Sequence, residues 1–423
     1  MEKQNSSYRW VVFAAVLAAY FLIVSQRTAP GLITDRLMKE FTISASTIGL
    51  LTSIQFLAYA GLQIPIGILS DRFGPNFFLI GGTILNGLGT FLYSLAPNEA
   101  VLFTARLLVG MGDATIWVNL VLILSQWFKV KEFIGLLGIA GMSGGLGFLM
   151  ATVPFSAWIA ATSWRIPFFT VGILLMGIGI FLYFILVKRP EQIGIVSSEK
   201  KKKAAVKKAV KREKTRVILR RVFTERQTWA TFFCHFGVVG TYVGFIGSWA
   251  VPYGMQVYDM SRSAASQLIM IGLFGAIAGG PLTTWITSRL EMIKRPYVMI
   301  QCLVFIGWTS FLLFGGKPPF FLLAVLFLLI GYGNGASALT FAVVRQSFPI
   351  KEVGVVSGVA NTGGFLSAVL LPTVFGKVLD YFNTAGSNVG YRYGFLIPVV
   401  FSLLGLVGSL LIKEQRQGEK QGS

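Results

Sequence analysis

The amino-acid sequence predicts an all-α membrane protein whose twelve transmembrane helices form two parallel six-helix repeats around a central cavity. Three observations support this fold class: the composition, a regular series of apolar segments, and the similarity of the two halves of the chain. Of the 423 residues, 54% are hydrophobic and only 13% are charged, whereas about a quarter are charged in an ordinary soluble domain. So few charged residues cannot cover several soluble domains, which indicates that much of the surface faces lipid.

The apolar segments set the number of helices. A helix needs about 20 mostly apolar residues to cross a bilayer, because lipid offers no partner for exposed backbone N–H and C=O groups. Breaks at charged residues, Pro and Gly leave twelve such segments, at residues 10–30, 46–70, 77–96, 100–127, 133–159, 166–187, 227–257, 264–287, 296–316, 320–346, 353–379 and 393–412. We therefore expect a six-helix bundle over 1–187, a basic cytoplasmic linker over 188–226 and a second six-helix bundle over 227–423.

The distribution of basic residues predicts the orientation. With the N-terminus inside, cytoplasmic segments hold 28 of the 37 Lys and Arg residues and outer loops hold seven, so the positive-inside rule places both termini in the cytoplasm. We expect a monomeric multi-pass protein of the plasma (inner) membrane. The linker carries 15 basic and 4 acidic residues. It could be a nucleic-acid arm, but the absence of aromatic residues among its lysines favours a linker near anionic headgroups, without nucleic acid.

Residues at the junction of the fourth and fifth segments recur 220 positions later in the chain. Phe128 and Glu132 are matched in this way by Phe348 and Glu352. Near the second segment, the matched residues are 217 positions apart. Each half has an even number of segments, so the two repeats share one orientation. Parallel repeats joined by a cytoplasmic linker are typical of transporters that move one half against the other around a site at the bilayer midplane.

The run Gly-Ile-Leu-Ser-Asp-Arg-Phe-Gly at 67–74 resembles the Gly-x-Leu-x-Asp-Arg-x-Gly signature of the major facilitator superfamily. With the twelve segments and the repeat, the resemblance covers nearly the whole chain. The carboxylate of Asp71 can lie against the positive N-terminal end of the eleventh helix, near residues 353–355, a contact worth about 1 kcal/mol. We also expect Arg72 to reach Glu132. Such contacts would favour the outward-open state, whereas the alternative is a plain turn with a solvated Asp–Arg pair. The predicted conformational lock consists of Gly67, Asp71, Arg72, Gly74 and Glu132.

Asp113 is the one acidic residue that falls deep within a predicted span. An unpaired carboxylate at the bilayer centre costs at least about 2.5 to 3.5 kcal/mol, so such a residue usually faces a cavity. Burial also makes its neutral form accessible, and Asp113 is therefore the candidate for proton coupling. The alternative is a carboxylate that is permanently paired with a basic group and serves helix packing.

Arg27 and Arg106 are the two basic residues within the predicted spans. Arg106 precedes Asp113 by seven residues, which places both on one helix face about 10 Å apart. Because the first and fourth helices line the central cavity in the superfamily, the resemblance implies that all three residues face it. Two guanidiniums with one protonatable carboxylate suit the co-transport of an anion with protons. The alternative for Arg27 is that its side chain extends to the outer headgroups.

Two short patterns resemble the anion:cation symporter branch of that superfamily. Arg106-x-x-x-Gly110-x-x-Asp113-Ala114 is similar to its fourth-helix pattern Arg-x-x-x-Gly-x-x-Glu-Ala, and Gln26-Arg27 resembles its first-helix Asp-Arg pair. In that branch the Arg of the pair contacts the anionic substrate and the two acids handle protons. Gln26 cannot ionise, which leaves Asp113 as the single predicted proton carrier.

Helical spacing adds candidates for the cavity wall. His235, Tyr242 and Trp249 recur every seven residues and would form a stripe on the seventh helix, although such stripes also serve helix packing. For His235 we expect a satisfied polar contact rather than a second proton site. The predicted substrate-binding residues are Arg27, Arg106, Tyr20, Gln55, Tyr59, Tyr242, Trp249, Asn334 and Asn361.

The predicted function follows from these groups. The sequence shows no nucleophile–base pair, metal-ligand cluster or phosphate-binding loop, so we expect neither an enzyme nor a cofactor. The leading hypothesis is a secondary active transporter that moves a small organic anion, a carboxylate, with protons by alternating access. One alternative is a proton-driven exporter of hydrophobic or cationic compounds, although Arg27 and Arg106 would repel a cation. Another is a non-transporting membrane receptor built on a transporter fold.

Overall fold

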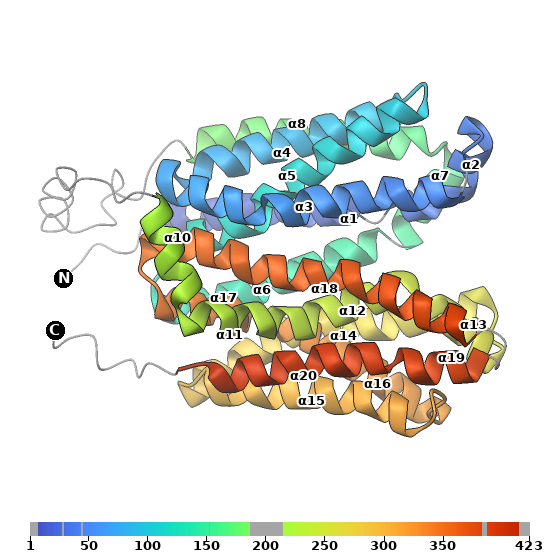
Figure 1. The fold of residues 1–423 in the computed structure, drawn as a ribbon. Helices are drawn as coiled ribbons and strands as arrows, with labels where there is room; N and C mark the ends of the chain where they lie inside the picture. Colours follow the sequence, from blue (N-terminus) through green and yellow to red (C-terminus); the bar gives the residue numbers. More distant parts are fainter. Residues whose placement is uncertain are drawn as a thin grey trace, which may run out of the picture. The chain divides into compact units, whose positions relative to one another are not determined.

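A computed structural model of the protein describes residues 7–27, 29–43, 45–151, 153–186, 215–382 and 387–413. Within these ranges all regular structure is helical (Figure 1). The lysine cluster of the predicted linker, at residues 200–211, lies outside the described residues.

The first half of the chain forms the helices expected for six spans. Their bounds agree with the predicted segments to within a few residues: α1 (Tyr8–Arg27), α3 (Ala45–Phe73), α4 (Pro75–Ser94), α5 (Glu99–Trp127), α6 (Val130–Met150), α7 (Val153–Ala161) and α8 (Arg165–Leu186). The fifth predicted span is divided between α6 and α7. Pro154 lies in the first turn of α7, where its missing N–H leaves no intrahelical hydrogen bond unmade.

Local sequence explains where two of these helices begin. Pro75 is the first residue of α4, and Gly74 before it has a φ of 95°, a conformation that residues with side chains avoid. A single residue therefore separates α3 from α4. Asn98 caps α5, because its side-chain oxygen accepts a hydrogen bond from the Val101 N–H at 3.1 Å.

Two further helices are not evident from the sequence pattern. α2 (Thr34–Phe41) follows the 3-10 helix η1 (Ala29–Ile33) in the loop after α1, and α10 (Thr215–Thr224) forms part of the predicted linker. Glu40 of α2 accepts a hydrogen bond from Trp164 Nε1 at 2.8 Å and pairs with Arg165. Although burial alone would raise it, these hydrogen bonds hold the pKa of Glu40 below its ordinary value.

The second half of the chain supplies the other six spans. Its elements are α11 (Arg226–His235), the π-helix η3 (Phe236–Gly240), α12 (Thr241–Ser248), α13 (Ala250–Tyr258), α14 (Arg262–Leu290), α15 (Lys294–Leu313), α16 (Phe320–Ala336), α17 (Leu339–Ser347), the 3-10 helix η4 (Ile350–Glu352), α18 (Val353–Tyr381), α19 (Ser387–Gly394) and α20 (Leu396–Leu411). The seventh span is the most interrupted of these. Its α12 ends at Ser248, because Pro252 has no N–H to donate to the carbonyl of that residue.

The described residues include eleven helices that are long and apolar enough to cross a membrane. The remaining predicted segment, 46–70, lies in α3, whose 29 residues extend for about 43 Å and exceed the hydrocarbon thickness of a bilayer. Each of the twelve predicted segments therefore falls on a helix. This result confirms the predicted fold class of an all-helical membrane protein.

Packing divides the chain into two compact units, each of which includes a piece of the other half of the sequence. Unit 1 comprises Met1–Phe133, Ala151–Glu225 and Pro349–Gly358, and unit 2 comprises Ile134–Met150, Arg226–Phe348 and Val359–Ser423. Most of α6 thus packs within unit 2, and the first residues of α18 pack within unit 1. The division into bundles at 1–187 and 227–423 stays a prediction.

Glycines explain how these two helices reach their neighbours. In unit 1 a Cβ atom on Gly67 of α3 would lie 2.4 Å from the Gly354 carbonyl oxygen of α18. In unit 2 a Cβ atom on Gly138 of α6 would lie 3.0 Å from the Gly280 carbonyl oxygen of α14. Only glycine lets the helix backbones approach so closely.

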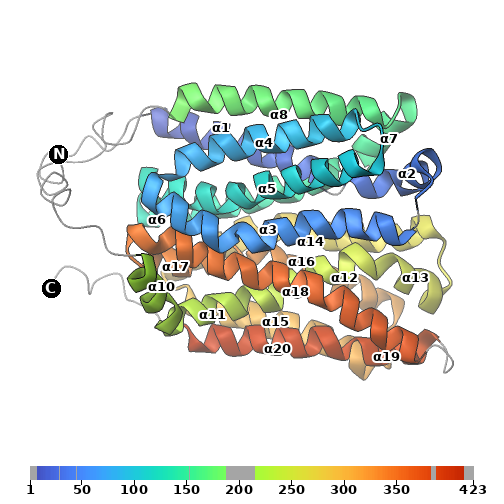
Figure 2. The same cartoon turned by 45° about the horizontal axis from the view of Figure 1, so that its top comes forward.

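Within unit 1 the fourth span lies against both the second and the third. α5 packs against α3 and α4, and α4 also packs against α8, which Figures 1 and 2 show as helices running side by side. A Cβ atom on Gly112 of α5 would lie 2.7 Å from the Asn86 backbone nitrogen of α4. This contact brings Asn86 next to Asp113.

Unit 2 contains a large aromatic core. Phe245, Trp308, Phe311 and Phe395 are fully buried, and the rings of Phe311 and Phe395 stack with their centroids 4.6 Å apart. Aromatic pairs of this kind contribute about 0.5–1.5 kcal/mol each beyond the burial of their area. This core packs α12, α15 and the start of α20 against one another.

Candidate functional site

Asp113 lies at the centre of a buried polar cluster in unit 1, and only 1% of its surface is exposed. Its Oδ2 accepts hydrogen bonds from Arg27 Nε at 3.2 Å and from Gln55 Nε2 at 2.8 Å. Its Oδ1 accepts a hydrogen bond from Asn86 Nδ2 at 2.8 Å. The three donors come from α1, α3 and α4, so one carboxylate on α5 connects four helices.

Gln26 extends this cluster by one hydrogen bond. Its Nε2 donates to Asn86 Oδ1 at 2.9 Å, and both side chains are buried. An amide therefore stands where the branch pattern has its first acid, and it orients Asn86 toward Asp113. Asn86 was not among the predicted site residues, and the one signal for it in the sequence is a lone Asn within the apolar run of α4.

Arg27 does not extend to water, because only 8% of its surface is exposed. Its guanidinium pairs with Asp113 and lies 5.3 Å above the centre of the Tyr59 ring. The opposite charges are thus held together in a low-dielectric environment, where removing one partner is costly. The structure brings Arg27, Gln55, Tyr59 and Asp113 into one cluster, as their predicted common role requires.

Arg106 is buried as well, with 3% of its surface exposed, but it lies apart from this ion pair. Its guanidinium is 5.9 Å from the centre of the Tyr93 ring. Within the described part of the chain, Arg106 Nε and the Tyr93 hydroxyl have no hydrogen-bond partner. Helical spacing placed Arg106 on the face of Asp113, but the extended side chain reaches α4 instead of the carboxylate.

Tyr20 completes the side chains of α1 that were predicted for the site. Its ring lies 5.3 Å from that of Trp117, which is one turn beyond Asp113 on α5. Tyr20 is therefore packed on the same helix that carries the carboxylate.

The remaining substrate-binding candidates belong to unit 2. Tyr242 and Asn361 are buried, whereas Trp249 and Asn334 are partly buried. Trp249 Nε1 donates to the Pro372 carbonyl oxygen at 3.1 Å, and its ring stacks on that of Phe375.

The predicted stripe of His235, Tyr242 and Trp249 is not continuous. The π-helix η3 lies between the first two residues, and the third, Trp249, lies in the break between α12 and α13. A π turn closes i→i+5 hydrogen bonds and so holds more residues than an α turn. A spacing of seven residues then no longer returns to the same face, which corrects the expectation of a single stripe.

His235 makes a polar contact within unit 2, as predicted from the sequence. Its Nδ1 lies 3.4 Å from Thr340 Oγ1, which in turn shares a hydrogen bond of 2.6 Å with the Tyr297 hydroxyl. These side chains belong to α11, α17 and α15. These three side chains join three helices of unit 2.

Asp71 meets the N-terminal end of α18, as predicted. Its Oδ1 accepts a hydrogen bond from the Gly354 N–H at 2.9 Å, and its Oδ2 accepts one from the Val355 N–H at 2.7 Å. Two otherwise unpaired amides and the positive end of the helix dipole thus bind one carboxylate. Its role as a conformational lock stays a prediction.

The expected contact between Arg72 and Glu132 is replaced by another pair. Glu132 Oε2 accepts a hydrogen bond from Arg9 Nη1 at 3.1 Å, and its Oε1 lies 3.0 Å from Arg9 Nη2 in an ion pair. Arg72 is exposed and lies over the ring of Phe73. Arg9, at the start of α1, is thus the partner of Glu132 in place of Arg72.

A matching ion pair occurs at the repeat partner of Glu132. Glu352, which follows Glu132 by 220 positions, pairs with Arg221 of α10. In each half, an arginine close to the start of the first span thus pairs with a glutamate close to the start of the fifth. The sequence repeat matches the glutamates but not the arginines, so neither pair was predicted from the sequence.

Comparisons with known proteins provide independent information on family and fold. The model of the Major Facilitator Superfamily matches residues 13–372 and 294–423. The "Probable sulfoacetate transporter SauU" of Cupriavidus necator is 24% identical, covering 97% of this chain and 95% of that protein. The "Hexuronate transporter" of Bacillus subtilis is 24% identical, covering 85% of each chain. The fold is similar to that of the E. coli fucose:proton symporter FucP, with a TM-score of 0.71, 15% identity and coverage of 97% of this chain and 100% of that chain.

Proposed function

The chain belongs to the Major Facilitator Superfamily and is a secondary transporter rather than an enzyme, and from this premise we propose that it carries a small organic anion, a carboxylate, together with protons. The observation that carries the proposal is the buried pair of Arg27 and Asp113. The relatives named as transporters of sulfoacetate and hexuronate support an anionic substrate.

The charge balance in unit 1 favours an anion. Away from the span ends, the buried ionisable groups described in unit 1 include two guanidiniums, Arg27 and Arg106, and one carboxylate, Asp113. The buried groups at the span ends, Arg9 and Glu352, are paired with Glu132 and Arg221. The buried charge is therefore positive, and it becomes more positive when Asp113 takes up a proton. Since an uncompensated buried charge is costly, a bound anion stabilises this state, whereas a cation would be repelled.

Coupling follows from competition for Arg27. While Asp113 is ionised it holds the guanidinium, so the substrate carboxylate has no partner there. Protonation of Asp113 weakens that bond and frees Arg27 to bind the substrate. When the substrate leaves, Asp113 loses its proton and pairs with Arg27 again, which makes the two movements depend on each other.

Gln55 offers a partner for the proton. Its Nε2 donates to Asp113, while its Oε1 is buried without a hydrogen-bond partner in the described part of the chain. A half-turn of the amide would present this oxygen to a protonated Asp113, which could then donate to it. The cluster can thus satisfy both the ionised and the neutral carboxyl group.

The test is uptake of labelled carboxylates by proteoliposomes with an alkaline interior, using sulfoacetate, hexuronates and related acids as probes. For a transported anion, Arg27→Ala should reduce uptake about 30-fold or more, since removing one partner of a buried charge pair costs at least about 2 kcal/mol. Asp113→Asn mimics the protonated form and should retain exchange of internal for external substrate but lose accumulation driven by the proton gradient.

Arg392→Ala is the matched control, because this arginine is exposed and lies over Tyr393 rather than in the cluster. It should transport like the unmodified protein. Uptake that ignores the proton gradient for every anion tested, or that survives Arg27→Ala unchanged, would refute the proposal.

A further inference from the structure

The ion pair between Arg221 and Glu352 joins the helix α10 to the start of α18 within unit 1. Arg221 belongs to α10, and Glu352 is the last residue of η4, directly before α18. Only 4% of the Glu352 side chain is exposed, whereas 43% of the Arg221 side chain is. A buried carboxylate is costly without a cation beside it. Arg221 therefore balances a charge that would otherwise destabilise the start of α18.

Glu352 is also close to the carboxylate of Asp71. Two residues after Glu352, the Gly354 N–H donates to Asp71 Oδ1, and the next amide, that of Val355, donates to Oδ2. Asp71 follows the last residue of the predicted span 46–70. Burial raises the pKa of Asp71, the two amide hydrogen bonds lower it, and the negative charge of Glu352 raises it again. The charge of Glu352 thus opposes the ionised carboxylate that the α18 amides bind.

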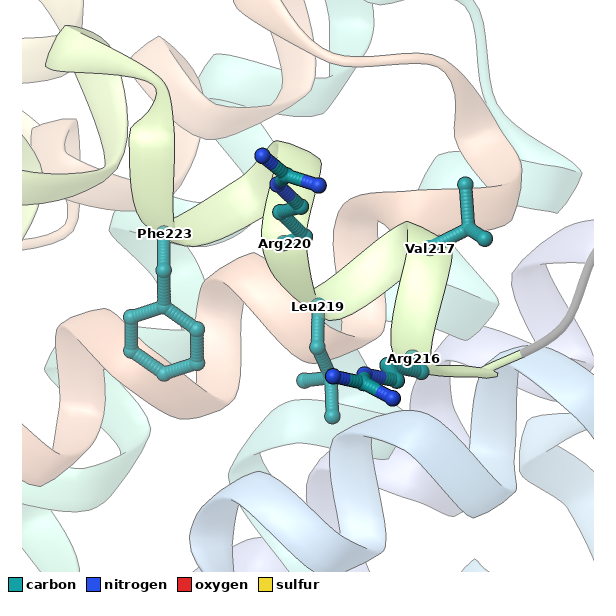
Figure 3. A pocket seen from close by; sticks show the side chains of 5 residues that line it. All are labelled: Arg216, Val217, Leu219, Arg220 and Phe223. Atoms are coloured by element: carbon teal, nitrogen blue, oxygen red, sulfur yellow. The ribbon is translucent and has the colours of Figure 1, made fainter.

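Arg221 has a neighbour of the same charge in a different position. Arg220 is exposed and extends away from Arg216, Leu219 and Phe223, as Figure 3 shows. In the described part of the chain Glu352 pairs with Arg221 and not with Arg220. The two adjacent arginines therefore separate the effect of this ion pair from the effect of positive charge on α10.

We propose that Arg221 is a positioning residue for the contact between Asp71 and α18. It acts through Glu352. While the ion pair is intact, the charge of Glu352 is balanced, and Asp71 binds the Gly354 and Val355 amides as a carboxylate. When the pair is broken, the two acids repel each other, and the start of α18 separates from α3 more often. The helix at the end of the linker thus determines how firmly α3 holds α18, whichever anion is transported.

A cysteine at position 357 reports on this contact. Ser357 is fully buried, and its Oγ has no hydrogen-bond partner in the described part of the chain. It lies one turn after Gly354 on α18, so Ser357→Cys should react with a polar maleimide only when the start of α18 leaves α3. The reporter is placed in the full-length protein carrying Cys234→Ala and Cys302→Ala, which remove both native thiols. The labelling rate is measured in detergent at one fixed pH, and thermal unfolding checks that each variant is folded.

Arg221→Gln should raise the labelling rate about tenfold, which is less than a fully buried pair would give because Arg221 is partly exposed. Arg221→Lys keeps the charge and should label nearly as slowly as the unmodified reporter. The matched control Arg220→Gln removes the same charge one residue away and should also label slowly. Adding Glu352→Gln to Arg221→Gln should restore most of the protection, because the repulsion of Asp71 is then absent.

A second background shows whether Arg221 acts through Asp71. Asp71→Asn should itself raise the labelling rate, and adding Arg221→Gln to it should change the rate by less than about twofold, since effects that share one contact do not add. An equal increase with and without Asp71→Asn would overturn the proposal, because Arg221 would then only anchor α10. Equal rates for Arg221→Gln and Arg220→Gln would also overturn it. So would a failure of Glu352→Gln to restore protection, because the effect would then not depend on the charge of Glu352.

Discussion

At the scale of single residues, Asn86 links Gln26 to Asp113. It accepts a hydrogen bond from Gln26 through Oδ1 and donates one to Asp113 through Nδ2. The donor at position 26 fixes Oδ1 on one side of this amide, while Nδ2 also donates to the Val109 carbonyl oxygen at 3.3 Å. Replacing Gln26 by an acid would make this orientation depend on pH.

We predict that Gln26→Glu gives the protein a new pH dependence. A protonated glutamate can still donate to Asn86 Oδ1, but an ionised one can only accept, so Asn86 would turn and withdraw its N–H from Asp113. Uptake at a fixed proton gradient should match the unmodified protein at low pH and fall about tenfold at high pH, as expected for a lost hydrogen bond to a charged group. Gln26→Met, which removes the donor without titrating, should lower uptake equally at every pH. Parallel pH profiles for Gln26→Glu and the unmodified protein would contradict the prediction.

Part of the site was predictable from residue type and spacing. A lone acid and two arginines within apolar segments identified Asp113, Arg27 and Arg106, because buried charges are rare in membranes. The pairing was not predictable, since helical periodicity gives the face of a helix but not the direction of a long side chain. The direction of Arg106, which lies over Tyr93 on α4, could not be predicted for this reason. The contact of Asn86 with Asp113 depends on the packing of α4 against α5, which the sequence pattern does not give.

At the scale of helices, close contact depends on individual glycines. Gly67 lies against the backbone of α18, whereas Gly61, on the same helix α3, has nothing within 4 Å of an added Cβ atom. The two positions therefore separate the effect of helix propensity from the effect of packing.

We predict that Gly67→Ala destabilises the protein and Gly61→Ala does not. The added methyl at position 67 would lie 2.4 Å from the Gly354 carbonyl oxygen, and such overpacking typically costs about 1–3 kcal/mol. At position 61 alanine should be neutral or stabilising by up to about 1 kcal/mol, since it is the better helix former. Thermal unfolding of the two variants in the same detergent measures the difference. Equal midpoints would show that the contact between α3 and α18 yields without cost.

The spans themselves could be predicted because hydropathy acts over about 20 residues, and each predicted segment falls on a helix. Shorter features could not be predicted in this way. α10 has ten residues and follows a run of lysines, so its apolar face is lost in the average over a window. The interruption after His235 is set by backbone hydrogen bonding in η3, for which the sequence Phe-Gly-Val-Val-Gly carries no distinct pattern.

At the scale of the whole molecule, the number of ionisable groups in the site limits the net charge that crosses the membrane in each transport cycle. Asp113 is the one carboxylate buried away from the span ends in the described part of unit 1, because Glu352 lies at the start of its span and pairs with Arg221. Gln26 takes the place of a second acid beside Asp113. A carrier with one proton site that transports a monovalent anion with one proton moves no net charge in each cycle.

We therefore predict that uptake of a monovalent substrate responds to the proton gradient but not to the membrane potential. Proteoliposomes with potassium gradients and valinomycin set the potential, and nigericin collapses the proton gradient as a control. Uptake should be unchanged at positive and negative potentials and should fall to equilibration after nigericin. Acceleration by an interior-negative potential would contradict the prediction, because it would require more than one proton for each anion.

The π-helix η3 gives the seventh span a different rotational register from the first. α1 runs without interruption from Tyr8 to Arg27, whereas the seventh span holds an additional residue within the wide turn at Phe236–Gly240. Each residue of an α-helix turns the chain by about 100°. Deleting one residue from this turn would let α11 and α12 join as a regular helix and would rotate all side chains on one side of the junction by about that angle. The face that Tyr242 presents is therefore set by a backbone insertion rather than by its distance from His235 along the chain.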